Sequence, residues 1–84
     1  MPIRAYVLVN TDPGKTTDVA NQVSNVSGSP RVKKCCVVMG RFDVLAEVEA
    51  DDLNSLTNTV LSKIATIPGV RRTETAVVTW EKNP

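Results

Sequence analysis

The order of its apolar segments is the strongest constraint on the fold of this 84-residue chain. Four short runs are rich in β-branched and other apolar residues, and two further segments repeat apolar residues at helical spacing. The strands are expected at residues 3–9, 32–39, 44–50 and 70–80, and the helices around residues 19–26 and 53–64. The chain therefore predicts the order β-α-β-β-α-β within a single domain, residues 1–84.

Turn and capping residues separate these segments. Asp12 is expected to cap the first helix with Pro13 in its first position, and this helix is expected to end near Gly28-Ser29-Pro30. The remaining breaks are a hairpin turn at Gly40-Arg41-Phe42-Asp43, an acidic helix start at Asp51-Asp52 and a helix stop at Pro68-Gly69.

Right-handed crossovers place both helices on the same face of such a sheet. We therefore expect an α+β fold, a ferredoxin-like βαββαβ sandwich in which a four-stranded antiparallel sheet carries two helices on one face. Residues 5–9 and 35–39 are nevertheless apolar at positions that point to both faces. Strands that are covered on one side alternate more cleanly, so the second face is expected to meet another copy in a dimeric α/β-barrel-like assembly.

Composition excludes several classes of function. The net charge of +1 gives no basic surplus for binding nucleic-acid phosphates. The chain contains no His, the commonest general base and metal ligand, so neither a metal site nor a cofactor is expected. The Cα atoms of the neighbouring residues Cys35 and Cys36 lie about 3.8 Å apart, too close for an ordinary disulfide. In a strand their side chains point to opposite faces. Without a signal peptide or a membrane-spanning run, a cytoplasmic location is expected.

Three segments, taken in order, resemble a known family. The first strand runs into Asp12-Pro13-Gly14, a turn and strand follow at Gly40-Arg41-Phe42-Asp43-Val44-Leu45, and Pro68-Gly69-Val70 leads into Thr73-Glu74-Thr75. They are similar to the ligand-binding domain of Lrp/AsnC proteins, the RAM domain, with its Gly-x-aromatic-Asp turn and its Pro-Gly-Val-x-x-Thr-x-Thr ending. The resemblance extends from about Ile3 to Thr79.

The resemblance implies a sensor that regulates transcription. Family members carry a helix-turn-helix before this domain. Because the first strand is expected to begin almost at Met1, the chain resembles the stand-alone form of the domain. No direct DNA binding is expected for this form. The family forms dimers through its sheets, and the dimers assemble into rings, commonly of eight subunits. Amino acids or related effectors bind between dimers, and a full-length Lrp/AsnC regulator is a further partner. No membrane partner is expected.

The resemblance also implies a set of ligand-binding residues. Asp43 can accept from an ammonium group, and backbone N–H groups at Gly40 and Arg41 can donate to a carboxylate. Thr73 and Thr75 are two apart in a strand, so both hydroxyls face the same way. The candidate positions are Gly40, Arg41, Phe42, Asp43, Thr73 and Thr75.

Each of these residues also has a structural interpretation. Gly40 can serve only the turn, Phe42 can pack in the dimer, and Asp43 can cap the turn through its own backbone. The threonines can simply favour a strand on a half-exposed face. Lys33-Lys34 and Arg71-Arg72 can bind an anion if the fold brings them together, or can be solvated surface charges, and Trp80 can anchor an interface or cover the core.

Three functions therefore remain open. The first is a non-enzymatic amino-acid sensor that reports through oligomerisation or by pairing with a full-length regulator. The second is a small enzyme of the dimeric α/β-barrel type, although the lack of His argues against catalysis. The third is an assembly module that binds no ligand.

Overall fold

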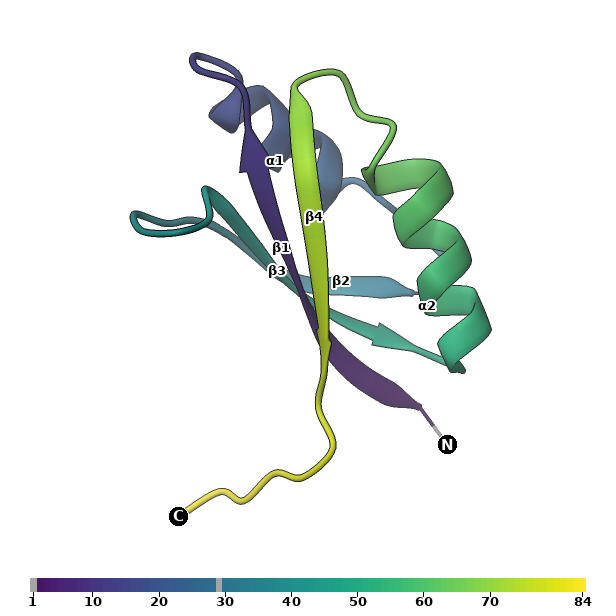
Figure 1. The fold of residues 1–84 in the computed structure, drawn as a ribbon. Helices are drawn as coiled ribbons and strands as arrows, with labels where there is room; N and C mark the ends of the chain where they lie inside the picture. Colours follow the sequence, from purple (N-terminus) through teal and green to yellow (C-terminus); the bar gives the residue numbers. More distant parts are fainter. Residues whose placement is uncertain (1, 29) are drawn as a thin grey trace.

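The computed structural model describes residues 2–28 and 30–84, and it has the element order that the sequence predicts. The strand order is β2-β3-β1-β4, and each pair of neighbours is antiparallel. Both helices pack on the same face of the sheet (Figure 1), which confirms the ferredoxin-like α+β fold. The elements are β1 (Ile3–Thr11), α1 (Thr16–Ser24), β2 (Arg31–Val37), β3 (Val44–Ala50), α2 (Leu53–Thr59), a π-helical turn η1 (Val60–Ile64) and β4 (Val70–Val77).

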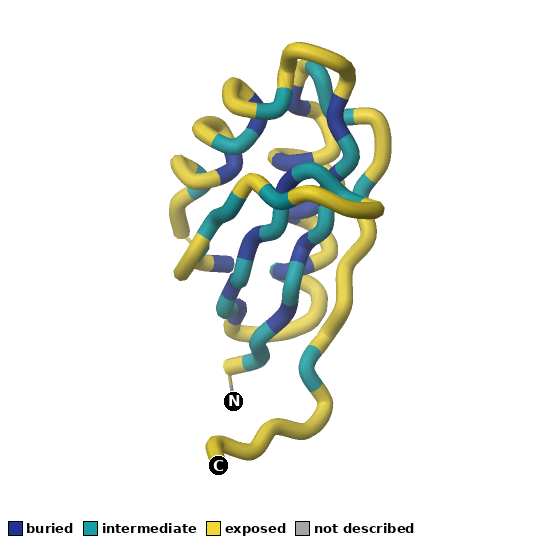
Figure 2. The backbone as a smooth tube through the Cα atoms, turned by 90° about the vertical axis from the view of Figure 1, so that its left-hand side faces the viewer, coloured by how far each residue is buried: buried dark blue, intermediate teal, exposed yellow. Residues whose placement is uncertain are grey.

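The core lies between the sheet and the helices. Every second residue of β1 and β3 is buried, and in Figure 2 these residues form dark blue steps along the two central strands. Val7 on β1 and Val19 and Ile64 from the helical side are fully buried. No helix among the described residues is long and apolar enough to cross a membrane.

The opposite face of the sheet carries no helix. Leu8 pairs with Leu45, Leu45 pairs with Cys36, and Tyr6 lies one row along, so an apolar group runs across three strands. All four side chains are only half-buried. Charges border this group, since Glu47 pairs with Tyr6 and Glu74 pairs with Leu8. In the next row Arg4 forms ion pairs with Glu81 and Glu47 that raise its pKa. The expectation that one copy leaves this face uncovered is confirmed.

The first helix differs from its predicted limits. β1 continues to Thr11, and the following residues form a turn in which the Lys15 N–H donates to the Asp12 carbonyl at 3.0 Å. The helix therefore begins at Thr16 with Lys15 as its N-cap residue, and the prediction that Asp12 caps it is wrong. It ends at Ser24, before the predicted stop at Gly28-Ser29-Pro30, of which Ser29 lies outside the described residues.

The second helical segment begins as predicted and then changes its winding. The Asp52 carboxylate accepts from the Ser55 N–H at 2.7 Å, and this capping bond lowers the pKa of Asp52. From Val60 the helix widens into the π turn, where the Ala65 N–H donates to the Val60 carbonyl. Of the predicted apolar stripe, Leu56, Val60 and Ile64 are buried, whereas Leu53 and Leu61 are exposed.

Two further strand ends differ from the prediction. β2 ends at Val37 rather than Met39, whose side chain is fully exposed in the loop. β4 ends at Val77, and the chain beyond it leaves the sheet as an extended tail (Figure 1). Trp80 on this tail is 77% exposed, so it does not cover the core of its own chain.

Cys35 and Cys36 lie on opposite faces of β2, as predicted. The Cys35 thiol contacts the Ala20 carbonyl of α1 at 3.6 Å, and Cys36 pairs with Leu45 on the uncovered face. Both thiols are free. Burial, and then the neighbouring Cys36, raises the pKa of Cys35, so this residue behaves as a small packed side chain.

Candidate functional site

The loop between β2 and β3 is fastened to the end of β1 through Asp43. Its backbone N–H donates to the Val9 carbonyl, and its own carbonyl accepts from the Val38 N–H, both at 2.9 Å. Its carboxylate Oδ2 accepts from the N–H of Thr11 at 2.8 Å and lies 3.3 Å from the Thr11 hydroxyl. The carboxylate is therefore held in one place by a residue of the neighbouring strand rather than by its own turn.

The rest of the turn is oriented by two further features. Gly40 has a φ of 146°, a backbone conformation that favours glycine, and an added Cβ would meet no atom within 4 Å. Gly40 is thus needed for the path of the backbone, which supports its structural interpretation. The Arg41 carbonyl accepts from the Asn10 side chain at 2.8 Å, and Phe42 is half-buried.

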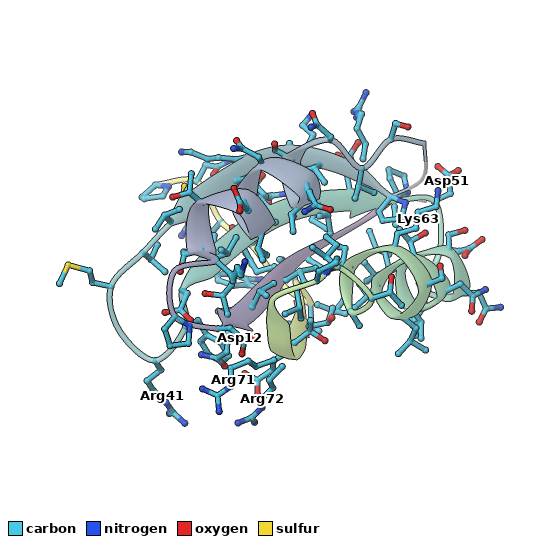
Figure 3. The ribbon with its side chains drawn as sticks, turned by 90° about the horizontal axis from the view of Figure 1, so that it is seen from above. Asp12, Arg41, Asp51, Lys63, Arg71 and Arg72 are labelled. Carbon is cyan, nitrogen blue, oxygen red and sulfur yellow. The ribbon has the colours of Figure 1, made fainter. Side chains whose placement is uncertain are left out.

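A cavity of about 330 Å³ opens beside Asp43. Arg71 and Arg72 of β4 line it together with Asn10 and Thr11 of β1. Figure 3 shows Arg71 and Arg72 at the same end of the molecule as Arg41 and Asp12, far from Asp51 and Lys63. Of the six candidate residues, Asp43 alone lines this cavity. The sequence had indicated no role for Asn10 or Thr11, which it placed in the break after the first strand.

The charges around this cavity form only loose pairs. Arg71 Nε lies 3.6 Å from Asp12 Oδ1, and an Arg72 terminal nitrogen lies 3.8 Å from Glu74 Oε1. Both distances exceed ordinary hydrogen-bond lengths, and all four side chains are more than half exposed. Such pairs contribute little to stability, so the two guanidinium groups are available to another anion.

The sequence left two interpretations of the basic pairs open, a shared anion site or solvated surface charges, and the structure does not bring the two pairs together. Lys33 and Lys34 lie on β2 and Arg71 and Arg72 on β4, and these strands form opposite edges of the sheet. Arg71 and Arg72 lie instead beside the β2–β3 loop that carries Arg41 (Figure 3).

Thr73 and Thr75 lie on one face of β4, as predicted, but in a different cavity. They pair with Val9 and Val7 and therefore face the helical side of the sheet. This second cavity, also about 330 Å³, is a groove between β4 and the α2–η1 segment. Its other lining residues are Leu53, Leu56, Thr57, Val60, Leu61 and Val77.

Within one chain Asp43 and the two threonines therefore line separate cavities, and Gly40, Arg41 and Phe42 line neither of them. A third cavity of about 430 Å³ lies beside Arg31 and Glu49 and contains none of the predicted residues. Among residues 2–28 and 30–84, no group of three or more Cys, Asp or Glu side chains is placed to hold a metal ion.

Comparison with known proteins identifies the class of domain. The family described as the Lrp/AsnC ligand binding domain matches residues 4–82, so the chain belongs to this family. An uncharacterised HTH-type transcriptional regulator of Pyrococcus abyssi is 31% identical over 80 residues, which are 95% of this chain and 49% of the regulator. The chain spans about half the length of such regulators.

A similar sequence also occurs within an enzyme. A homocitrate synthase of Saccharolobus islandicus is 35% identical over 77 residues, which are 90% of this chain and 16% of the synthase. The match is therefore confined to a small part of that protein.

Solved structures support the fold. A Thermus thermophilus protein is 27% identical and superposes with a TM-score of 0.85, over 98% of both chains. A Neisseria meningitidis transcriptional regulator, solved as a complex with L-Met, superposes with a TM-score of 0.79 over 98% of this chain and 53% of that one. At 22% identity, the latter similarity concerns the fold alone.

Proposed function

We propose that the chain is a non-enzymatic, amino-acid-sensing module of a Lrp/AsnC-type regulator. The effector binds between copies, where Gly40, Arg41, Phe42 and Asp43 of one copy face the Thr73/Thr75 strand of a neighbour. Family membership and the L-Met complex of the Neisseria regulator support an amino-acid effector. The observation that carries the proposal is the position of Asp43, whose carboxylate is fixed by Thr11 at the edge of an open cavity.

Each part of this site has a suitable chemistry. A zwitterion needs an acceptor for its ammonium group, and Asp43 provides one that is already oriented. The groove beside Thr73 and Thr75 combines two hydroxyls with the side chains of Leu56 and Val60, which suits the aliphatic part of an amino acid. Since the two cavities are separate in one chain, a neighbouring copy is required to bring them together.

The uncovered sheet face supplies the primary contact between copies. Leu8, Leu45 and Tyr6 form an apolar group that a second copy can cover through the same surface, as a two-fold interface requires. Dimers formed in this way leave the two cavities free for contacts between dimers in a ring of about eight subunits. Because the net charge is only +1, we propose no direct contact with DNA. We also propose a cytoplasmic location.

Thermal unfolding in the presence of each of the twenty amino acids tests the sensor. A ligand present at about one hundred times its dissociation constant stabilises the folded state by about 2.7 kcal/mol, enough to raise the melting temperature by about 10–20 °C. If no amino acid changes the melting temperature at millimolar concentration, an assembly module without a ligand becomes the better explanation. Mass spectrometry of the bound effector after long incubation should show it chemically unchanged, and turnover would favour the enzyme.

Asp43→Asn is the sharpest variant for this test. Asparagine retains an oxygen acceptor for the Thr11 N–H and removes the charge that would pair with an ammonium group, so ligand stabilisation should disappear while the fold remains. Asp43→Ala also removes the acceptor of Thr11 and should cost about 1–3 kcal/mol of unfolding free energy. Asp18→Asn, on the exposed side of α1, is the matched control and should respond to ligand as the wild type does.

The output of the module is a second question. The regulators of Pyrococcus favour pairing with a full-length Lrp/AsnC protein, and the similarity to homocitrate synthase favours control of an enzyme as the alternative. Native mass spectrometry of this chain mixed with a purified full-length regulator should detect mixed oligomers whose proportion changes with the effector. Only homo-oligomers at every effector concentration would contradict the pairing.

A further inference from the structure

The two arginines of the first cavity are brought together by an irregularity in the sheet. Asn10 pairs with Arg72 and Thr11 pairs with Val70, so Arg71 is an extra residue on β4 with no partner in the β1–β4 register. Consecutive residues of a regular strand point to opposite faces, whereas a bulge turns an extra side chain out of this alternation. Both Arg71 and Arg72 consequently line the same cavity as Asp43.

The charge of this lining selects among amino acids. Arg71 and Arg72 contribute two positive charges and Asp43 one negative charge, so the lining carries +1. An acidic amino acid has two carboxylates and one ammonium group, a net charge of −1, and each of its charged groups meets an opposite charge. A neutral amino acid has one carboxylate and leaves a guanidinium group without a ligand partner.

The present partners of Arg71 and Arg72 do not prevent these arginines from binding a ligand carboxylate. Asp12 and Glu74 lie 3.6 and 3.8 Å from the guanidinium nitrogens, in exposed pairs that a bidentate carboxylate can replace. The volume of about 330 Å³ is at the lower end of the range of about 300–1,000 Å³ for small-molecule sites, which suits a ligand as small as an amino acid.

We infer that the effector is an acidic amino acid, whose ammonium group binds Asp43 and whose two carboxylates bind Arg71 and Arg72. This inference rests on the proposed function, because it names the effector class of the same site. The nearby loop, held through the bond from Asn10 to the Arg41 carbonyl, keeps Asp43 in place as the ammonium partner.

Calorimetric titration of the assembled protein with matched ligands tests the inference. L-Glutamate should bind at least tenfold more tightly than L-glutamine, and L-aspartate more tightly than L-asparagine, because each amide has the shape of its acid without the second charge. Glutarate, which lacks the ammonium group, should bind more weakly than L-glutamate. Raising the salt concentration should weaken the binding of L-glutamate more than the binding of L-glutamine.

Arginine variants test which residues cause the preference for acidic amino acids. Arg71→Gln and Arg72→Gln should each lower the preference for L-glutamate at least tenfold, and circular dichroism with thermal unfolding should show that each variant is folded. Arg31→Gln is the matched control, since Arg31 also pairs with a glutamate, 3.1 Å away, but lies at the other end of the sheet on β2. It should leave the preference unchanged.

The outcomes separate the two claims. Binding of an amide or another neutral amino acid as tightly as the acids would overturn this inference and leave the proposed sensor intact. A preference for acids that survives in both Arg71→Gln and Arg72→Gln would overturn the assignment of the arginines. No binding by any amino acid would contradict the proposed function itself.

Discussion

The two faces of the sheet use the same central strands and have opposite properties. On the helical face, Val7 and Val48 are almost fully buried beneath the helices, and the packing over the two central strands is complete within one chain. On the other face, Leu8 and Leu45 are only half-buried, and charged residues border them, since Glu74 of β4 pairs with Leu8 and Glu47 lies one row away. The first face thus supplies the stability of the chain, and the second is left for association.

This difference has a general physical cause. A chain of 84 residues buries a limited fraction of its surface, and its two short helices cover one face of the two central strands. Apolar side chains on the other face gain further burial, at about 25 cal/mol per Å², only when another surface covers them. The comparison predicts that substitutions on the two faces affect different measurements.

The largest effect on stability is expected from the helical face. Ile64 in η1 is fully buried, so Ile64→Ala removes core contacts and should lower the unfolding free energy by about 2–5 kcal/mol. Leu61→Ala is the matched control from the same turn, where the side chain is 63% exposed, and should change it by less than about 0.5 kcal/mol. Denaturant unfolding measures both, and equal losses would contradict the assigned core.

The next effect is expected in the mass of the assembly. Leu8→Lys puts a charge into the apolar group of the uncovered face, and covering it would require moving an ammonium group out of water, even with Glu74 opposite it on β4. Association should weaken more than tenfold, and light scattering at micromolar concentration should detect monomers with unchanged circular dichroism. Met39→Lys, at a fully exposed loop position, should leave the mass unchanged. A wild-type protein that is already monomeric would contradict the proposed role of this face.

The smallest effect is expected in the reactivity of the two cysteines, one of which lies on each face of the sheet. In the Leu8→Lys protein, a thiol reagent at pH 8 should modify Cys36 several times faster than Cys35. Burial raises the pKa of Cys35, so its reactive thiolate forms only at a higher pH than in an ordinary thiol. Cys35→Ser and Cys36→Ser variants identify which thiol reacts. Equal rates in both variants, across the pH range, would contradict the placement of Cys35 against α1.

The candidate site was only partly predictable from the sequence. The shared direction of Thr73 and Thr75 follows from the period of a strand, and the structure confirms it. The partner of Asp43 did not follow, because Thr11 is 32 residues away and local patterns carry no information about such a contact. For the same reason, the sequence could not decide whether Lys33-Lys34 and Arg71-Arg72 meet, since strand order decides which segments become neighbours.

By itself the sequence determined the succession of elements, the limits of β3 and the alternation of its two faces, because side-chain periodicity follows from local backbone geometry. The start of α1 at Thr16 and the π turn after Thr59 depended on packing against the sheet. Only the tertiary structure decided that Arg71 leaves the regular pairing and joins Arg72 beside Asp43. A bulge is an adjustment between two paired strands, so it exists only once β1 and β4 have met.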